Sequence, residues 1–309
     1  MPMKLTGLIA ASHTPMHLDG TVDMERVEQQ TSWYQNNPID GAFICGTTGE
    51  GKLLTVDERK RIAECWIDNS PADYPIIVHV GDESLEHCKT LAHHAQEMGA
   101  HAISLIAPNF YKPSDLDELV SFCQAVAESA PQTPFYYYHI PALTGVHDRM
   151  IDFLAAAQEK LPTLAGIKFS HNDLCDLLLC LRYEDHRYNI LFGRDELMLA
   201  GLIYGIDGAV GSTYNYAAPL YQKLIEFFDA GQMERAREMQ TLAIDMIALL
   251  TQYNEIAVGK AIMTWLGLNC GYVRRPLKNL SPDERKSIEH AFAARAFEPY
   301  LCKQNQLTA

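Results

Sequence analysis

One lysine stands inside a short apolar run, Leu-Ala-Gly-Ile-Lys-Phe-Ser at residues 164–170. A strand interior is an unusual place for an ammonium group, because burial removes its hydration. Desolvation favours the neutral amine, which is a nucleophile able to form a Schiff base with a carbonyl substrate. The alternative is a structural lysine at a strand end, with its charged head in solvent. Lys168 is therefore a candidate nucleophile, and this run alone leaves both interpretations open.

A candidate anion-binding loop, Gly-Thr-Thr-Gly-Glu-Gly at residues 46–51, follows the apolar run 39–45. The hydroxyls of Thr47 and Thr48 and the free amides of a glycine-rich loop are all hydrogen-bond donors. Such a loop can hold a carboxylate. Glycine-rich turns between a strand and a helix are also common as purely structural features, so the motif alone leaves both roles open.

Three tyrosines and a histidine end another apolar run, Tyr136-Tyr137-Tyr138-His139. The alternation of a strand sends Tyr136 and Tyr138 to one face and Tyr137 to the other. An inward Tyr138 at the strand end is able to move protons to and from a substrate hydroxyl. The alternative is aromatic filling of the core. His139 is either a base or a structural hydrogen-bonding residue.

Polar residues also follow two later apolar runs. Asp195 and Glu196 come after residues 190–193, and Ser212 comes after residues 208–211. Carboxylates and hydroxyls at these positions can bind substrate hydroxyls. Acidic residues also favour the start of a helix through its dipole, so a structural role is the alternative.

All these residues follow strands in a repeated strand-then-helix pattern. The strands are mostly apolar without alternation, as expected when both faces of a parallel sheet are buried. Eight units in about 230 residues predict a closed (β/α)8 TIM barrel, with an open doubly wound sheet as the alternative. No Gly-x-Gly-x-x-Gly motif follows the first strand, which disfavours a dinucleotide-binding sheet. The predicted strands are 5–11, 39–45, 75–80, 102–107, 133–139, 164–169, 190–193 and 208–211.

The helices of the pattern divide the chain into two parts. Residues 1–230 are predicted to form the barrel, and residues 231–309 a C-terminal helical extension packed on it. In a TIM barrel the C-terminal ends of the strands form the active site, so we expect the candidate residues to converge there. The predicted helices are 24–35, 56–69, 85–98, 115–128, 149–160, 173–182, 196–204 and 219–230, followed by 233–250, 254–266 and 281–296.

Composition excludes several classes of partner. A net charge of -14 argues against nucleic acid and anionic membranes, which attract basic surfaces. The eight cysteines include no Cys-x-x-Cys pair, which indicates thiols in a reducing compartment rather than a disulfide framework. The twelve histidines show no metal-binding spacing, so we expect no metal and no cofactor. No apolar run is long enough to span a membrane. A soluble, cytoplasmic protein is expected.

Several of these motifs together resemble one enzyme family. They are residues 46–51, Tyr-His-Ile-Pro-Ala-Leu-Thr-Gly at 138–145, residues 166–170 and Gly-Ala-Val-Gly-Ser-Thr-Tyr-Asn at 208–215. Their order and spacing are similar to those of the dihydrodipicolinate synthase / N-acetylneuraminate lyase family. The resemblance covers nearly the whole chain, through Lys260 and the tail around residues 267–277.

The resemblance implies a class I aldolase that cleaves N-acetylneuraminate reversibly to pyruvate and N-acetylmannosamine. It implies that Lys168 forms the Schiff base and that Tyr138 transfers protons. Thr47 and Thr48 match the positions that bind the pyruvyl carboxylate. It also implies small-molecule substrates (sialic acid and pyruvate) and a homotetramer. The positions that match binding of the sugar chain are Ser170, Gly193, Asp195, Glu196, Gly211 and Ser212.

Two features of the sequence indicate which branch of the family it resembles. Synthases carry an arginine two residues after the proline of the strand-five motif, where this chain has Leu143. The acidic pair Asp195-Glu196 also suits a hydroxylated substrate better than an anionic one. The lyase branch is therefore expected. The alternatives are an aldolase or dehydratase acting on another 2-keto-3-deoxy sugar acid, a synthase-like enzyme, or a non-catalytic sugar-acid-binding protein.

The chain departs from the family pattern at two places. A relay tyrosine follows strand four in synthases and some lyases, and Phe110 aligns with it here, with Tyr111 beside it. Either Tyr111 or water would then complete the relay. Arg194 is also unusual, and it is positioned to reach toward the far end of the sugar and change substrate preference.

Overall fold

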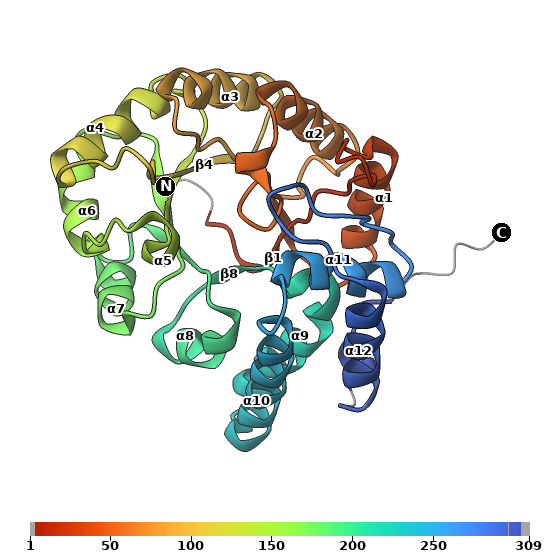
Figure 1. Ribbon diagram of the computed structural model, residues 1–309. Helices are drawn as coiled ribbons and strands as arrows, with labels where there is room; N and C mark the ends of the chain where they lie inside the picture. Colours follow the sequence, from red (N-terminus) through yellow and green to blue (C-terminus); the bar gives the residue numbers. More distant parts are fainter. Residues whose placement is uncertain (1–3, 296, 304–309) are drawn as a thin grey trace.

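The computed structural model describes residues 4–295 and 297–303. Eight parallel strands follow one another around a closed barrel, with β8 paired to β1. Helices surround the strands (Figure 1), so the predicted (β/α)8 TIM barrel is confirmed and the open sheet is wrong. The strands are β1 (Gly7–Ala11), β2 (Gly41–Ile44), β3 (Ile76–His79), β4 (Ala102–Ile106), β5 (Phe135–His139), β6 (Leu164–Phe169), β7 (Asn189–Phe192) and β8 (Gly208–Gly211).

Most helix boundaries agree with prediction to within two residues, and local chemistry explains where they begin. Thr55 and Glu58 form the predicted capping box at the start of one helix. The α-helices are α1 (Met24–Gln35), α2 (Val56–Asp68), α3 (Leu85–Glu97), α4 (Leu116–Ala127), α5 (Pro141–Thr144), α6 (Met150–Ala157), α7 (Leu174–Arg182), α8 (Met198–Tyr204), α9 (Tyr214–Asp229), α10 (Met233–Leu250), α11 (Glu255–Trp265) and α12 (Pro282–Ala293). Three short 3-10 helices are η1 (Gly51–Leu53), η2 (Asp195–Leu197) and η3 (Glu298–Tyr300).

The predicted start of α9 at Pro219 is wrong by more than a turn, because the helix begins at Tyr214. Ala217 has non-helical backbone angles and kinks the helix, which places Pro219 just after the break. A proline near the start of a helical segment loses no hydrogen bond that the segment needs. The predicted helix 281–296 ends at Ala293, and residue 296 lies outside the described residues.

The strands separate two apolar layers. Tyr136 and Tyr138 pack inside the barrel, whereas Tyr137 packs outside it and stacks on Phe153 of α6 at 4.6 Å between ring centroids. This alternation is the one predicted for β5. The outer layer is filled by the helices, which explains strands that are apolar on both faces.

Two asparagines join the first strand to later parts of the barrel. Asn189 accepts a hydrogen bond from the Leu5 amide and donates one to the Leu5 carbonyl, each 3.1 Å long. Its Oδ1 also accepts a bond from the Tyr136 hydroxyl at 2.9 Å. At the other end, the Asn215 amide donates to the Ala11 carbonyl at 2.7 Å. The closure of the barrel is therefore held by side chains as well as by the β1–β8 ladder.

The C-terminal helices lie beside α9 in Figure 1, with α10 packed along α9 and contacts from α10 to α11 and α12. The three predicted helices are present, although the division of the chain at residue 230 stays a prediction. None of the helices in the described part of the chain is long and apolar enough to cross a membrane.

We predict that Asn189→Leu lowers the free energy of unfolding by about 3 kcal/mol or more, because it leaves three buried polar groups without partners. Tyr136→Phe removes only one of those bonds and should cost about 1 kcal/mol. Thermal and urea unfolding measure both. If the two variants unfold with equal free energies, the bonds from Asn189 to Leu5 do not stabilise the closure of the barrel.

Candidate active site

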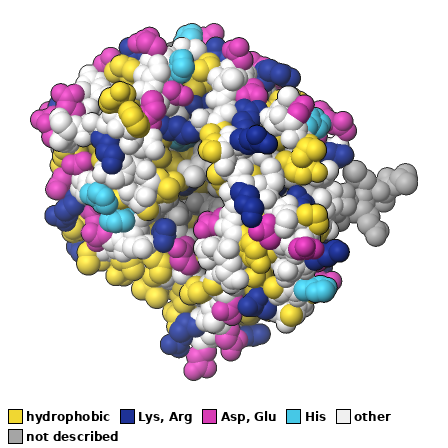
Figure 2. Space-filling model, in the orientation of Figure 1, with side chains coloured by type: hydrophobic (Ala, Val, Ile, Leu, Met, Phe, Trp, Pro, Cys, Tyr) yellow, Lys and Arg dark blue, Asp and Glu magenta, His cyan; other side chains and the backbone are white. Residues whose placement is uncertain are grey.

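A cavity of about 550 Å³ opens at the C-terminal ends of the strands, and Figure 2 shows this face hollowed near its centre. All ten residues predicted to form the site line it, so the structure brings them together as the barrel rule requires. They are Thr47, Thr48, Tyr138, Lys168, Ser170, Gly193, Asp195, Glu196, Gly211 and Ser212.

Lys168 lies on β6 with only 4% of its surface exposed, so its side chain does not extend into bulk solvent. Its Nζ is 3.9 Å from the centroid of the Tyr138 ring and 4.1 Å from that of Phe43. Within residues 4–295 and 297–303 no carboxylate comes within ion-pair distance of this nitrogen. The amine therefore has aromatic neighbours that it can pack against and no fixed anion that holds it as an ammonium.

Tyr138 pairs with Lys168 in the β5–β6 ladder and points into the barrel. Its hydroxyl lies 3.5 Å from Thr47 Oγ1, so either group can donate to the other. The ring also meets Phe43 and His79 edge to face, at 5.7 and 6.0 Å between centroids. These contacts fix a hydroxyl that can exchange protons next to the amine.

The loop after β2 presents its two threonines to the cavity and buries the residues that follow. Thr47 is exposed and Thr48 half-buried, whereas Gly49 and Glu50 are buried. The Thr14 hydroxyl donates to the Gly49 carbonyl at 2.7 Å. The turn is so close to the strand that a Cβ at residue 51 would lie 1.8 Å from the carbonyl oxygen of residue 45, which only glycine avoids.

Asp195 lies in η2 and is buried below the surface of the cavity. Its carboxylate accepts bonds from the Thr213 amide at 3.0 Å and from the Thr213 hydroxyl at 2.6 Å. Burial raises the pKa of this carboxyl, and the two bonds from Thr213 oppose that rise. Asp195 is therefore held in place by Thr213, which follows β8 and precedes α9, and the Gln240 side chain of α10 also donates to its carbonyl.

Glu196 and Arg194 form an ion pair with 2.6 Å between Oε1 and Nη2, and both line the cavity. Glu255, at the start of α11, lines the same part. Burial raises the pKa of the Glu255 carboxyl, with a further contribution from the charge of Glu196. The wall at this end is rich in groups that bind hydroxyls.

At two glycines of the cavity, neighbouring side chains leave no room for a Cβ atom. A Cβ at Gly193 would lie 2.0 Å from Ser170 Oγ, and a Cβ at Gly211 would lie 2.0 Å from Asp195 Oδ1. Any larger residue would push these polar groups out of position.

Three residues weighed from the sequence lie outside this cavity. His139 is buried on the outer side of β5 against Phe169 and His171, and burial lowers the pKa of its imidazole to about 3. It is not placed to act as a base in the cavity. Phe110 and Tyr111 are 77% and 82% exposed and do not line the cavity of their own chain.

Sequence reasoning missed other parts of the wall. His13 follows β1 and lines the cavity, and burial, with a contribution from Lys260, lowers the pKa of its imidazole to about 3. Its position after a strand was a signal that could have found it. Thr251, Asn254 and Glu255 come from the connection between α10 and α11, where the barrel rule gives no signal.

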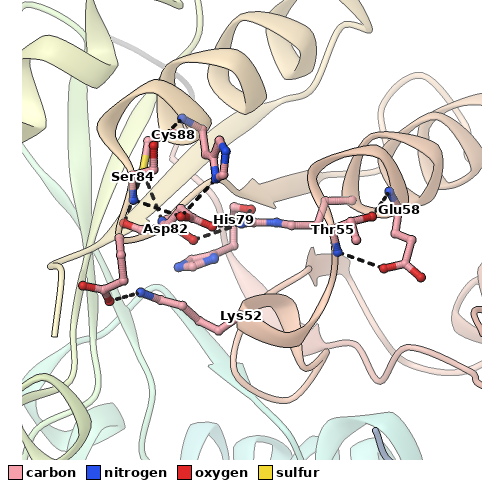
Figure 3. A network of polar contacts seen from close by, with 11 residues as sticks. Lys52, Thr55, Glu58, His79, Asp82, Ser84 and Cys88 are labelled. Atoms are coloured by element: carbon pink, nitrogen blue, oxygen red, sulfur yellow. Dashed lines mark hydrogen bonds and ion pairs between the residues drawn. The ribbon is translucent and has the colours of Figure 1, made fainter. Parts of the chain in front are cut away.

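A polar network supports the end of β3 beneath the site (Figure 3). Figure 3 labels His79 and Asp82 in this network. The buried guanidinium of Arg59 donates to the carbonyls of His79 at 2.6 Å and Gly81 at 3.0 Å, and lies 3.8 Å from the Asp82 carboxylate. Burial lowers the pKa of the His79 imidazole well below its usual range, so the ring against Tyr138 is neutral. No group of three or more possible metal ligands is found among the described residues.

Comparisons with known proteins agree with this geometry. Residues 4–295 match the model of the dihydrodipicolinate synthetase family. The chain belongs to this family. The N-acetylneuraminate lyase of Gallus gallus is 40% identical over 285 residues, which are 91% of this chain and 92% of that protein.

Solved structures of the family have the same fold over nearly the whole chain. The N-acetylneuraminate lyase of Proteus mirabilis is 41% identical, with a TM-score of 0.93, and the match covers 96% of this chain and all of that one. The structure of a catalytic lysine mutant of the Ruminococcus gnavus sialic acid aldolase is 27% identical, with a TM-score of 0.90 over 97% of this chain and all of that one.

We predict that Gly211→Ala raises the KM for a sugar-acid substrate at least about tenfold, because the new methyl group displaces Asp195 and its bonds to Thr213. Steady-state kinetics measure this. The control is Gly205→Ala, at a positive φ with open space around it, which should lower stability by about 1 kcal/mol and leave the KM unchanged. Equal KM values for the two variants would contradict the prediction.

Proposed function

We propose that this family member is a class I aldolase that cleaves N-acetylneuraminate reversibly to pyruvate and N-acetylmannosamine. The observation that carries the proposal is the buried Lys168, whose amine lies in the cavity wall against two aromatic rings, with no carboxylate at ion-pair distance among the residues that the structure describes. The relatives named N-acetylneuraminate lyase, at about 40% identity over most of the chain, support the same activity.

The reaction begins at the ketone carbon of the sugar acid. Thr47 and Thr48 hold the carboxylate with hydroxyl and amide donors, which places C2 against Lys168 Nζ. The amine attacks C2, and the resulting carbinolamine loses water to give an iminium ion. The ring of Tyr138 beside the nitrogen favours this positive charge through its π face.

Cleavage follows because the iminium accepts electrons. The C3–C4 bond breaks, its electron pair forms the enamine, and the C4 hydroxyl loses its proton as the aldehyde forms. The Tyr138 hydroxyl, held beside Thr47, relays that proton. Protonation of the enamine at C3 and hydrolysis of the imine then release pyruvate and restore Lys168.

The remaining cavity residues suit a polyhydroxylated chain. Ser170, Gly193, Gly211 and Ser212 contribute to the cavity wall, and Asp195 and Glu196 supply carboxylate acceptors. Leu143 lines the cavity where a synthase-like enzyme would need a cation for a second carboxylate. The second candidate substrate is another 2-keto-3-deoxy sugar acid. The feature that favours it is Arg194, which forms an ion pair with Glu196.

The proposal includes a cytoplasmic location and a homotetramer. The eight cysteines are free thiols in the structure, which supports a reducing compartment. The exposed Phe110 and Tyr111, in edge-to-face contact at 4.9 Å, are side chains that suit a contact between subunits. No metal or cofactor takes part in the proposed chemistry.

Borohydride reduction during turnover tests the nucleophile and the substrate together. With N-acetylneuraminate as the only added substrate, we expect a reduced pyruvyl adduct on Lys168, located by peptide mass mapping. Lys168→Ala should form no adduct and lose turnover while keeping its fold by circular dichroism. An adduct from added pyruvate but none from N-acetylneuraminate would keep the chemistry and exclude this substrate. Absence of both adducts would favour a binding protein.

Tyr138→Phe tests the proton relay separately. We expect kcat to fall by about 10²- to 10⁴-fold, the usual contribution of a positioned acid–base group. Pyruvate should still be trapped on Lys168, since the nucleophile and the carboxylate loop remain. Tyr136→Phe, which changes a tyrosine of the same strand deeper in the barrel, is the control and should keep kcat. A Tyr138→Phe variant with normal kcat would refute the assigned role.

A further inference from the structure

A buried ion pair lies directly behind the loop that presents Thr47 and Thr48. Glu50 Oε1 is 2.5 Å from Lys260 Nζ, and both side chains are almost completely shielded, with 0% and 1% of their surfaces exposed. The two residues come from distant parts of the chain, the loop after β2 and the middle of α11. Charges buried this deeply require partners, because neither can be hydrated.

The remaining polar atoms of the pair bond to the tail of the chain. Lys260 Nζ donates to the Tyr272 carbonyl at 2.5 Å, and Glu50 Oε2 accepts a bond from the Arg274 amide at 2.7 Å. Glu50 is thus held by α11 and by the segment that follows it. This set of contacts joins the loop to the C-terminal helices rather than to the rest of the barrel.

The backbone at Glu50 supports a specific role for its side chain. Glu50 has a φ of 57°, in the left-handed region that is unfavourable for a residue with a Cβ. The surrounding contacts hold the residue there, and the turn directs Thr47 to the cavity while Glu50 points away from it. The Glu50 amide also donates to the Thr47 carbonyl at 3.0 Å. A shift of Glu50 would therefore move the threonine backbone.

The same helix supplies part of the cavity wall. Asn254 caps the start of α11, and Asn254, Glu255 and Ile256 line the cavity. Lys260 lies little more than one turn farther along this helix. One helix thus carries both a part of the cavity wall and the cation that pairs with Glu50 of the threonine loop.

We propose that Glu50 and Lys260 are positioning residues: their ion pair fixes the carboxylate-binding loop against α11 and so sets the distance between the two ends of the substrate cavity. This inference rests on the proposed function, in which Thr47 and Thr48 bind the carboxylate. Neither residue lines the cavity, so they act through the threonines and not on the substrate itself.

The test is the concentration of pyruvate that gives half of the maximal borohydride trapping on Lys168. Glu50→Gln should raise this concentration about tenfold, because misplaced donors bind the carboxylate less well. The extent of trapping at saturating pyruvate should equal that of the wild type. An unchanged or lower half-saturating concentration would overturn the proposal.

Two further variants separate positioning from general stability. Glu58→Gln breaks the ion pair between the Glu58 carboxylate and the Arg274 side chain, which also joins the tail to the barrel, and leaves intact the bond from the Arg274 amide to Glu50. It should lower the melting temperature and leave pyruvate binding unchanged. If it weakens binding as much as Glu50→Gln does, tail docking in general is responsible and the proposal falls.

Glu50→Gln leaves the Lys260 charge buried without its partner, and such a loss is strongly destabilising. The double variant Glu50→Gln/Lys260→Met removes both charges while keeping the volume, so it is the version to measure if the single variant does not fold. It should show the same rise in half-saturating pyruvate, and binding like the wild type would refute the role of the pair. Failure of the wild type to trap pyruvate would instead refute the proposed function.

Discussion

The site depends on a buried lysine that meets aromatic rings and, within residues 4–295 and 297–303, no carboxylate at ion-pair distance. Two buried lysines show the contrast: Lys260 meets the Glu50 carboxylate at 2.5 Å, whereas the amine of Lys168 meets the rings of Phe43 and Tyr138. Burial lowers the pKa of Lys260, and the Glu50 carboxylate opposes that lowering and engages the lysine in an ion pair. The rings beside Lys168 are not anions, and their faces favour the cationic iminium that this amine forms. The same residue type is thus structural in one place and a proposed nucleophile in the other.

This arrangement needs a rigid frame, because an amine with no ion-pair partner is positioned by packing alone. The closed barrel supplies it: Lys168 is paired in register with Tyr138 across β5 and β6, and both strands are buried on both faces. Asn189 and Asn215 secure the first strand at the two ends of the barrel, so the ring of strands cannot open to relieve the buried lysine. The polar groups at the strand ends are then fixed by the same backbone that buries the amine.

Much of the fold and of the candidate site was predictable from the sequence, because strand periodicity and the barrel rule depend on the pattern of neighbouring residues. The apolar run around Lys168, the alternation of Tyr136 to Tyr138 and the threonine loop all follow from neighbouring residues, and the structure brings them to one cavity. The rest depended on distant contacts. Glu50 and Lys260 look like ordinary surface charges in the sequence, and only the fold buries them together. Pro219 misplaced the start of α9 because the break at Ala217 leaves no mark in the pattern. His139, by contrast, shares the outer face of its strand with Tyr137, where the same alternation places it once the inward face is known.

The division of labour within the cavity follows from which elements build it. The lysine, tyrosine and threonines sit on the barrel strands and their loops, where neighbouring strands fix them to each other. Another part of the wall comes from Arg194 and Glu196 after β7 and from the start of α11, outside the barrel pattern. Sequence change in α10 and α11 can therefore alter this part of the wall while the amine stays where it is. The ion pair of Glu50 with Lys260 limits that freedom, because it joins α11 to the loop that carries Thr47 and Thr48. The surroundings of Lys168 and the cavity wall can therefore change independently only as far as the Glu50–Lys260 pair stays in place.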